Sequence, residues 1–297
     1  MSLEPVRVDD LEVLEGRFQN AFVTGRAEGL DVVGYGEITS VVSWAGVNGM
    51  AVAKRLPTFR HGEGVEAYLA LLEDYVRGLQ AVDVSVVPTS HQTLRLDGRD
   101  VAVYLLQPLL PPELVGHVYL RQATEQQAIR LFDRVFEKTE AAIGARIGID
   151  AQISNWAVDG DDLVYFDITT PLLKDDQGVD RIDVDIFLAS LPWAIRGIVK
   201  RFLVVGIIED YFDVRTTILN LVAQFHKERL VSLIPLALEQ ANRRLPDPIG
   251  ADEVKRYYTS DARMWELLQR LRRMDRWWHH KVRRRPYPFL LPGKIDR

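Results

Sequence analysis

The sequence contains no cysteine and no long apolar run. The absence of thiols excludes disulfide bonds, zinc–thiolate sites and a cysteine nucleophile, and with them the small secreted scaffolds that depend on disulfides. Apolar stretches such as residues 202–208 are far shorter than the roughly 20 residues of a membrane-spanning helix. The acidic N-terminal segment lacks the apolar core of a signal peptide. We therefore expect a cytoplasmic protein without a membrane span.

Charge is distributed unevenly along a chain of otherwise ordinary composition. The 297 residues are 47% hydrophobic and 27% charged, which is enough to bury a sizeable core in one two-lobed domain or in two domains. The formal net charge is -5, but the segment from Asp261 to Arg297 carries +7, so the remainder carries -12. The C-terminal tail therefore needs an interpretation of its own.

The segment from about Leu30 to Leu110 has the pattern of a sheet. Short β-branched runs alternate with glycine, aspartate and proline, as expected for strands joined by turns. One amphipathic helix interrupts them over residues 64–80. Its predicted apolar stripe consists of Val65, Tyr68, Leu69, Leu72, Val76 and Leu79. The pattern predicts an antiparallel sheet with one helix.

The period becomes helical after the hinge-like segment 107–112. Thr124 is a predicted N-cap for the first long helix, and Asp159-Gly160 predicts the turn of a short hairpin. From Asp183 onward almost every segment has helical periodicity. The predicted fold class is thus α+β, with an N-terminal unit 1–106, a hinge 107–112 and a mainly helical unit 113–297.

The strongest chemical signal is the set Asp150, Asn155 and Asp167. Asp150 and Asn155 are five residues apart, and Asp167 follows across the predicted hairpin. Phosphoryl transfer needs a carboxylate that can accept the proton of an acceptor hydroxyl, a role suited to Asp150. It also needs oxygen ligands for Mg²⁺, which Asn155 and Asp167 can provide. This order and spacing match the catalytic loop and metal-binding aspartate of kinases.

On these residues the chain resembles the protein-kinase-like superfamily, and within it the small-molecule branch typified by aminoglycoside and choline phosphotransferases. The resemblance covers roughly Leu30 to Leu173. It implies a two-lobed fold, ATP and Mg²⁺ as cofactors, and an active site between the lobes.

The resemblance extends to an upstream nucleotide-binding region. Gly34, Tyr35 and Gly36 occupy the position of the glycine-rich loop over the ATP phosphates, and Lys54 occupies that of the lysine that contacts them. Backbone groups of Gln107 and Leu109 are predicted to meet adenine at the hinge, with Leu110 as an alternative to either of them.

The kinase pattern also requires a helix glutamate that pairs with the lysine. The predicted helix offers two, Glu66 and Glu73. We favour Glu73, which follows Leu72 at the edge of the apolar stripe, and keep Glu66 as the second choice.

Three positions depart from the kinase pattern. Thr39 stands where the third glycine of the loop is expected, Gly148 replaces the histidine before the catalytic aspartate, and Asp167 is followed by Ile168-Thr169 in place of Phe-Gly. Helices resume within about fifteen residues of Asp167, which leaves no room for a long activation segment and favours a small-molecule kinase over a protein kinase.

The sequence therefore predicts an ATP- and magnesium-dependent phosphotransferase acting on a hydroxyl of a small molecule. Two alternatives remain: a non-catalytic, nucleotide-binding regulatory module, and an enzyme that transfers AMP to a protein. The acceptor is not identified, although acidic residues favour a cationic one. These residues are Asp175, Asp176, Asp180, Asp183, Asp185, Glu209, Asp210 and Asp213.

The basic tail mixes arginines with Trp277, Trp278 and Tyr287. This composition suits contact with nucleic acid or with an anionic surface. It also suits a C-terminal helix whose tryptophans pack on the helical lobe while its arginines pair with acidic residues there, and we favour this second interpretation.

Overall fold

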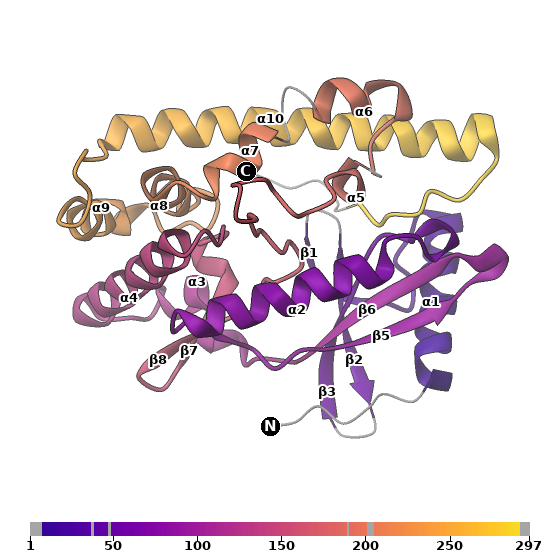
Figure 1. The fold of residues 1–297 in the computed structure, drawn as a ribbon, viewed down its shortest axis with the longest axis horizontal. Coiled ribbons are helices and arrows are strands. Elements are labelled where there is room, and N and C mark those ends of the chain that lie inside the picture. The colour runs from indigo at the N-terminus through magenta and orange to yellow at the C-terminus, as the bar shows by residue number, and fades with distance from the viewer. Residues whose placement is uncertain (1–7, 37–38, 47–48, 189, 201–204, 292–297) are drawn as a thin grey trace.

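The structure is a computed structural model with an α+β architecture. It describes residues 8–36, 39–46, 49–188, 190–200 and 205–291. The N-terminal region is built around a five-stranded sheet, and the C-terminal region is mainly helical (Figure 1). Within the described part of the chain, no helix combines the length and apolar character needed to cross a bilayer.

The large sheet confirms the predicted strand-rich region and is antiparallel throughout, with the strand order β1-β2-β3-β6-β5. Its strands are β1 (Asp31–Tyr35), β2 (Ser40–Gly46), β3 (Gly49–Arg55), β5 (Ser90–Arg95) and β6 (Val101–Pro108). Two short 3₁₀ turns occur in its connections: η1 (Arg60–Gly62) follows β3, and η2 (Asp97–Arg99) lies between β5 and β6. Successive side chains of β6 point to opposite faces and both sets are buried, so both faces of the sheet are covered.

Two helices cover these faces, and the prediction of a single N-terminal helix was wrong. Helix α2 (Val65–Ala81) packs on the face that includes Val103 and Leu105, whereas α1 (Val8–Thr24) packs on the face that includes Ala102 and Tyr104. The buried stripe of α1 consists of Leu11, Leu14, Phe18, Ala21 and Phe22. These residues recur at three- and four-residue steps, which is the pattern of an amphipathic helix. The acidic residues between them made that pattern less evident in the sequence.

Helix α2 matches the predicted range closely, but its buried face differs from the predicted stripe. Tyr75 and Leu71 are buried, whereas Leu69 and Val76 are only partly buried. The face therefore presents two tyrosines, Tyr68 and Tyr75, to the interior.

A second, three-stranded sheet links the two regions in the order β4-β8-β7. Strands β7 (Trp156–Asp159) and β8 (Asp162–Tyr165) form the predicted hairpin, and Gly160 has the positive φ of +61° that its turn requires. Strand β4 (Ser85–Val86) belongs to the N-terminal region but pairs in parallel with β8. This long-range pairing fixes the hairpin relative to the large sheet.

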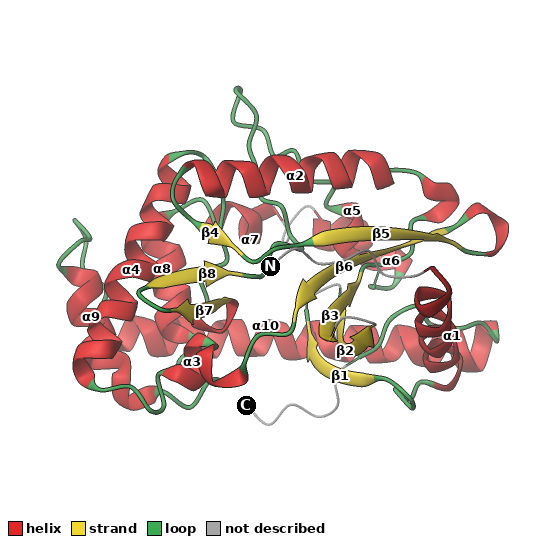
Figure 2. Cartoon of the chain, turned by 90° about the horizontal axis from the view of Figure 1, so that it is seen from below, coloured by secondary structure: helices red, strands yellow, loops and turns green. Residues whose placement is uncertain are grey.

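The C-terminal region is helical, as predicted. Its elements are η3 (Pro112–Leu114), α3 (Gly116–Tyr119), α4 (Glu125–Gly144), η4 (Ile153–Asn155), α5 (Asp185–Leu188), α6 (Trp193–Val199), α7 (Val205–Asp210), α8 (Val214–Ala223), η6 (Val231–Leu233), α9 (Ile234–Asn242), α10 (Ala251–Trp278) and the π-helical turn η7 (His279–Arg283). Thr124 caps α4 in a reciprocal arrangement with Gln127, which confirms the predicted N-cap. Figure 2 shows α3, α4, α8 and α9 on one side of the molecule and the large sheet on the other.

Two segments connect the sheet to the helices. After Pro108, residues 109–111 lead into η3, and the backbone N–H of Leu109 still donates to the Met50 carbonyl at 3.3 Å. The second connection comes from the C-terminal segment, where the Tyr287 N–H donates to the carbonyl of Phe22 in α1 and the Tyr287 hydroxyl donates to the Ser190 carbonyl. These connections add to the β4–β8 pairing that links the N- and C-terminal regions.

Candidate functional site

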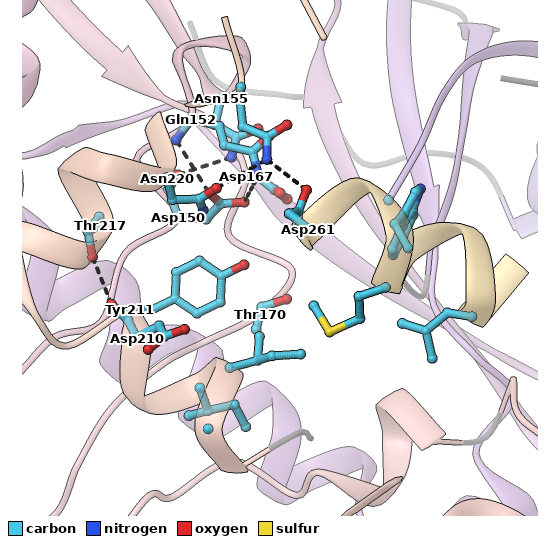
Figure 3. A pocket seen from close by; sticks show the side chains of 18 of the residues that line it. Asp150, Gln152, Asn155, Asp167, Thr170, Asp210, Tyr211, Thr217, Asn220 and Asp261 are labelled. Carbon is cyan, nitrogen blue, oxygen red and sulfur yellow. Dashed lines mark hydrogen bonds between the residues drawn. The ribbon is translucent and has the colours of Figure 1, made fainter. Parts of the chain in front are cut away.

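A cavity of about 590 Å³ brings together five of the residues predicted to carry chemistry. Lys54 and Gly34 are not among the described residues that line it. Tyr35 and Gly36 of the β1–β2 turn line it together with Asp150, Asn155 and Asp167. Figure 3 shows the side chains of Asp150, Gln152, Asn155 and Asp167 gathered at one end of this cavity. The catalytic-loop and metal-binding residues proposed from sequence thus share one solvent-accessible space with the predicted glycine-rich turn.

Local hydrogen bonds hold the loop that carries Asp150 and Asn155. The Asn155 side-chain amide donates to the Asp150 carbonyl at 3.0 Å, which closes the five-residue spacing into a compact turn. The backbone N–H and side-chain amide of Gln152 donate to the Asp150 carboxylate at 3.3 and 3.4 Å. The Asp150 carboxylate is therefore oriented within its own loop.

Lys54 lies beside Asp167 and the residue before it, Phe166. Lys54 and Phe166 are 112 positions apart in the sequence. Its ammonium donates to the Phe166 carbonyl at 2.7 Å and lies 3.8 Å from Asp167 Oδ1. Burial lowers the pKa of Lys54, and the nearby Asp167 carboxylate offsets this only in part. A buried ammonium with one carboxylate at this distance can accept further anionic partners.

The donor atoms at this end of the cavity suit a magnesium ion bound with phosphates. Asp167 Oδ1 accepts from the Thr169 hydroxyl at 2.9 Å, and Asn155 is held through its nitrogen, so its amide oxygen is not used by that bond. Within the described ranges, no group of three histidine, cysteine or acidic side chains forms a metal site by itself. Mg²⁺ commonly takes one or two protein oxygens and completes its shell with water and phosphate, so this pair fits.

The predicted pairing of Lys54 with Glu73 is not formed, and Glu66 does not replace it. Both glutamates are exposed on α2, and the carboxylate beside Lys54 is Asp167. Each residue along an α-helix rotates the side-chain direction by about 100°. Glu73 follows the buried Leu72 by one residue, so its side chain points away from the sheet. The prediction that Glu73 is a site residue is corrected accordingly.

The inward face of α2 instead positions the site through its two tyrosines. The Tyr75 hydroxyl donates to the Gly148 carbonyl at 3.0 Å, just before Asp150, and the Tyr68 hydroxyl donates to the Thr169 carbonyl at 2.9 Å, just after Asp167. Sequence reasoning missed this role. Tyr68 and Tyr75 are seven residues apart, a spacing that places both on one face of a helix and that could have indicated this role.

Gly148 is required by close packing. A Cβ at this position would lie 2.8 Å from Leu172 Cβ and 3.0 Å from the Phe212 ring, and the Gly148 N–H donates to the Leu172 carbonyl at 2.9 Å. The space that a histidine would need is filled by neighbouring side chains. Tyr75 and Phe212 therefore brace this part of the site.

Gln107 and Leu109 do not take the positions predicted for adenine binding. The buried side chain of Gln107 donates to the carbonyl of Phe166 and to the hydroxyl of Thr89, both at 3.0 Å, and the Leu109 N–H is used by Met50. Neither residue is among the described residues that line the cavity. The pairing of β6 with β3 continues past Gln107, which occupies backbone groups that the prediction had left free for a ligand.

The predicted glycine-rich turn is only partly described, because Glu37 and Ile38 lie outside the described residues. The Gly36 N–H donates to the Thr39 carbonyl at 3.0 Å, and a Cβ on Gly36 would collide with the Thr39 hydroxyl. Thr39 is buried in this turn. In this structure the turn itself uses the Gly36 N–H that was predicted to face phosphate, while Gly34 lies in β1 beside Val41.

The cavity continues between α7, α8 and α10, where its wall is acidic and aromatic. Asp210 and Tyr211 contribute from one side, and Tyr257 and Asp261 contribute from α10 (Figure 3). The Asp261 carboxylate accepts from the buried Gln224 amide at 3.2 Å. Burial raises the pKa of Asp210, and Asp213 adds to this effect. Tyr257 and Asp261 were not predicted from the sequence.

Of the acidic residues predicted to attract a cation, only Asp210 is among the described residues lining this cavity. The others that have resolved contacts serve the backbone or pair locally. Asp213 caps α8, Asp175 accepts from two backbone N–H groups of its own loop, and Glu209 pairs with Lys174 at 2.5 Å. Acidic side chains in loops commonly close turns in this way.

Comparison with known proteins places the chain in a single family. A comparison with curated proteins found no match. Residues 13–276 match DUF6206, described as a family of unknown function, and this range includes the sheet, the cavity and nearly all of α10. The chain therefore belongs to the DUF6206 family.

Proposed function

We propose that this protein is an ATP- and magnesium-dependent phosphotransferase with a kinase-like two-lobed fold, and that it phosphorylates a hydroxyl of a small molecule. The observation that carries the proposal is the convergence of the β1–β2 turn, the Asp150 loop and Asp167 on one cavity, with Lys54 beside Asp167. A structural role for each residue alone would not require the three segments to share a solvent-accessible space.

Each polar group has one role in this proposal. Lys54 binds and orients the nucleotide phosphates, and Asn155 and Asp167 hold Mg²⁺. The metal, when bound, neutralises charge on the phosphates. Asp150 orients the acceptor hydroxyl and takes its proton as the oxygen attacks the γ-phosphorus, while ADP leaves. Catalysis then depends mainly on orientation and electrostatic stabilisation.

The acceptor is proposed to carry positive charge as well as a hydroxyl. Asp210 and Asp261 line the cavity beyond Asp150, and Tyr211 and Tyr257 offer aromatic faces beside them. Carboxylates and aromatic rings together favour an amine or ammonium group. The cavity volume of about 590 Å³ lies within the range typical of small-molecule sites.

Isothermal calorimetry with ATP and Mg²⁺ tests the nucleotide site. We expect wild type to bind and Asp167→Ala to lose the metal-dependent part of the binding. Asp150→Ala should bind as wild type does but transfer no phosphate to any member of a panel of amine-bearing alcohols. Asp176→Ala is the matched control, since Asp176 is an exposed loop aspartate.

Three outcomes would contradict the proposal. The phosphotransferase proposal is wrong if wild type binds no nucleotide, or if Asp167→Ala binds nucleotide with unchanged metal dependence. If wild type binds MgATP but Asp150→Ala and wild type are equally inactive on every acceptor, a regulatory nucleotide-binding module is favoured. Mass spectrometry of modified protein would distinguish a transferred adenylate from a phosphate.

A further inference from the structure

The outward face of α10 carries large apolar side chains interleaved with cations. Residues on this face recur at steps of four and three, which keeps them on one side of the helix. They are Arg263, Leu267, Arg270, Met274, Trp277 and Lys281, and Lys281 lies in η7 directly after the helix. We call this set the α10 outer stripe.

The apolar members of the stripe are exposed to solvent. Leu267, Met274 and Trp277 are between 56 and 57% exposed, and the adjacent Trp278 is 44% exposed. This overturns the expectation that both tryptophans pack on the helical lobe; only Tyr287 of the three tail aromatics is buried. Figure 1 shows α10 along one edge of the molecule. Large apolar side chains that are exposed together on one helix face mark a candidate interaction surface.

Cations outnumber acidic residues in the segment that contains the stripe. From residue 261 to 291 the chain has nine lysines and arginines but only three acidic residues. Asp275 is buried and Asp261 lines the cavity, so Glu266, which pairs with Arg270 on the surface, is the acidic residue left to the outer side. Exposed pairs of this kind are weak. Beyond the tryptophans, the exposed side chains of Arg283, Arg284 and Arg285 add further positive charge.

Charge and apolar character together favour one occupant. A second copy of the chain would place arginines against arginines along the stripe. Nucleic acid would satisfy the cations, but it would leave Leu267 and Met274 against a polar phosphate backbone. An anionic lipid surface matches both features, because its headgroups attract arginine and lysine while its interface accommodates tryptophan and aliphatic side chains.

We propose that the α10 outer stripe docks this protein onto membrane surfaces rich in anionic lipids. The helix lies flat on the surface, with Trp277, Leu267 and Met274 at the level of the headgroups and the cations beside lipid phosphates. Attachment is peripheral and reversible, and it does not depend on the phosphotransferase activity.

Co-sedimentation of the full chain with vesicles tests this proposal. We expect binding to phosphatidylcholine vesicles that contain phosphatidylserine, little binding to pure phosphatidylcholine, and release as salt is raised. Arg270→Glu with Lys281→Glu should lower the partition coefficient by about tenfold or more, from the cation contribution to surface attraction. Trp277→Ser with Trp278→Ser should weaken binding at every salt concentration.

Matched controls separate the stripe from general surface effects. Arg243→Glu, directly after α9, and Val13→Ser on α1 change an exposed cation and an exposed apolar residue elsewhere, so both should bind as wild type does. Thermal unfolding should be unchanged in all variants, since the altered side chains are exposed. Absence of vesicle binding, or binding that the stripe variants leave unchanged, overturns the proposal. So does binding to a DNA or RNA duplex, or self-association in light scattering, that replaces vesicle binding.

Discussion

Two adjacent cations on β3, Lys54 and Arg55, lie on opposite faces of the same sheet and differ in how closely acidic side chains pair with them. Arg55 faces α1, where it donates to both carboxylate oxygens of Glu15 at 2.8 Å and to the Leu56 carbonyl at 3.0 Å. Lys54 lies on the other face, where the carboxylate of the cavity-lining Asp167 is 3.8 Å away. Both are almost completely buried, at 3 and 5% exposure, so solvent does not explain the difference.

The pKa values of Lys54 and Arg55 are shifted in opposite directions. Burial acts to lower the pKa of Arg55, but the hydrogen bonds and charge of Glu15 outweigh it and the pKa is raised. For Lys54 burial prevails and the pKa is lowered. A buried cation whose partners compensate its desolvation serves the fold, whereas an undercompensated one costs stability and retains affinity for an anionic ligand. We therefore propose a structural role for Arg55 and, within the proposed phosphotransferase, a ligand-binding role for Lys54.

The largest expected effect separates the two roles directly. Lys54→Met should reduce phosphate transfer by about a thousandfold or more, because phosphate orientation and charge stabilisation are lost. Its melting temperature should not fall, since an undercompensated charge leaves the interior. Steady-state kinetics and thermal unfolding of the same preparation make the measurement. A variant that retains activity, or one that is strongly destabilised, would reverse the assignment.

Arg55→Met should have the complementary effect on stability. Removing the guanidinium leaves the buried Glu15 carboxylate unpaired, which costs about 3–5 kcal/mol of unfolding free energy. The double variant Glu15→Leu with Arg55→Met removes both charges and should recover most of that loss. Urea titration of wild type, both single variants and the double variant forms the cycle. A double variant no more stable than Arg55→Met would show that the ion pair is not the source of the effect.

Acid should reveal the same ion pair in wild type. Burial acts to raise the pKa of Glu15, but Arg55 and Tyr104 together lower it below its ordinary value of 4.5. A depressed carboxyl pKa contributes stability that is fully present above pH 4.5 and is lost as pH falls toward the folded-state pKa. Wild type should therefore lose stability more steeply below pH 4.5 than the Glu15→Leu, Arg55→Met double variant. Parallel curves would argue against this contribution.

The smallest expected effect is at Glu73. Because its side chain is exposed and Lys54 lies beside Asp167, Glu73→Gln should change transfer by less than about twofold and stability by less than about 0.5 kcal/mol. Kinetics under saturating ATP provide the measurement, with Glu66→Gln as the matched control. A large loss of activity in Glu73→Gln alone would mean that α2 rotates to pair Glu73 with Lys54 when nucleotide binds.

Local patterns in the sequence identified much of the fold. The strands, helix α2, the Thr124 cap and the Asp159-Gly160 turn each follow from residues close together in the chain. Helix α1 was not predicted, although its apolar spacing was present locally and the buried run of β6 is typical of a sheet covered on both faces. The candidate site was found because Asp150, Asn155 and Asp167 lie within one short segment whose spacing is itself informative.

The sequence by itself determined which residues are candidates for the proposed chemistry, namely the carboxylates, the amide and the lysine. Only the tertiary structure decided what each one faces. A one-residue step turns a helical side chain by about 100° and a strand side chain to the opposite face, so Glu73 points to solvent and Tyr75 to Gly148, while Lys54 and Arg55 point apart. Partners such as Phe166 for Lys54 and Glu15 for Arg55 are set by packing between distant segments, which no local pattern specifies.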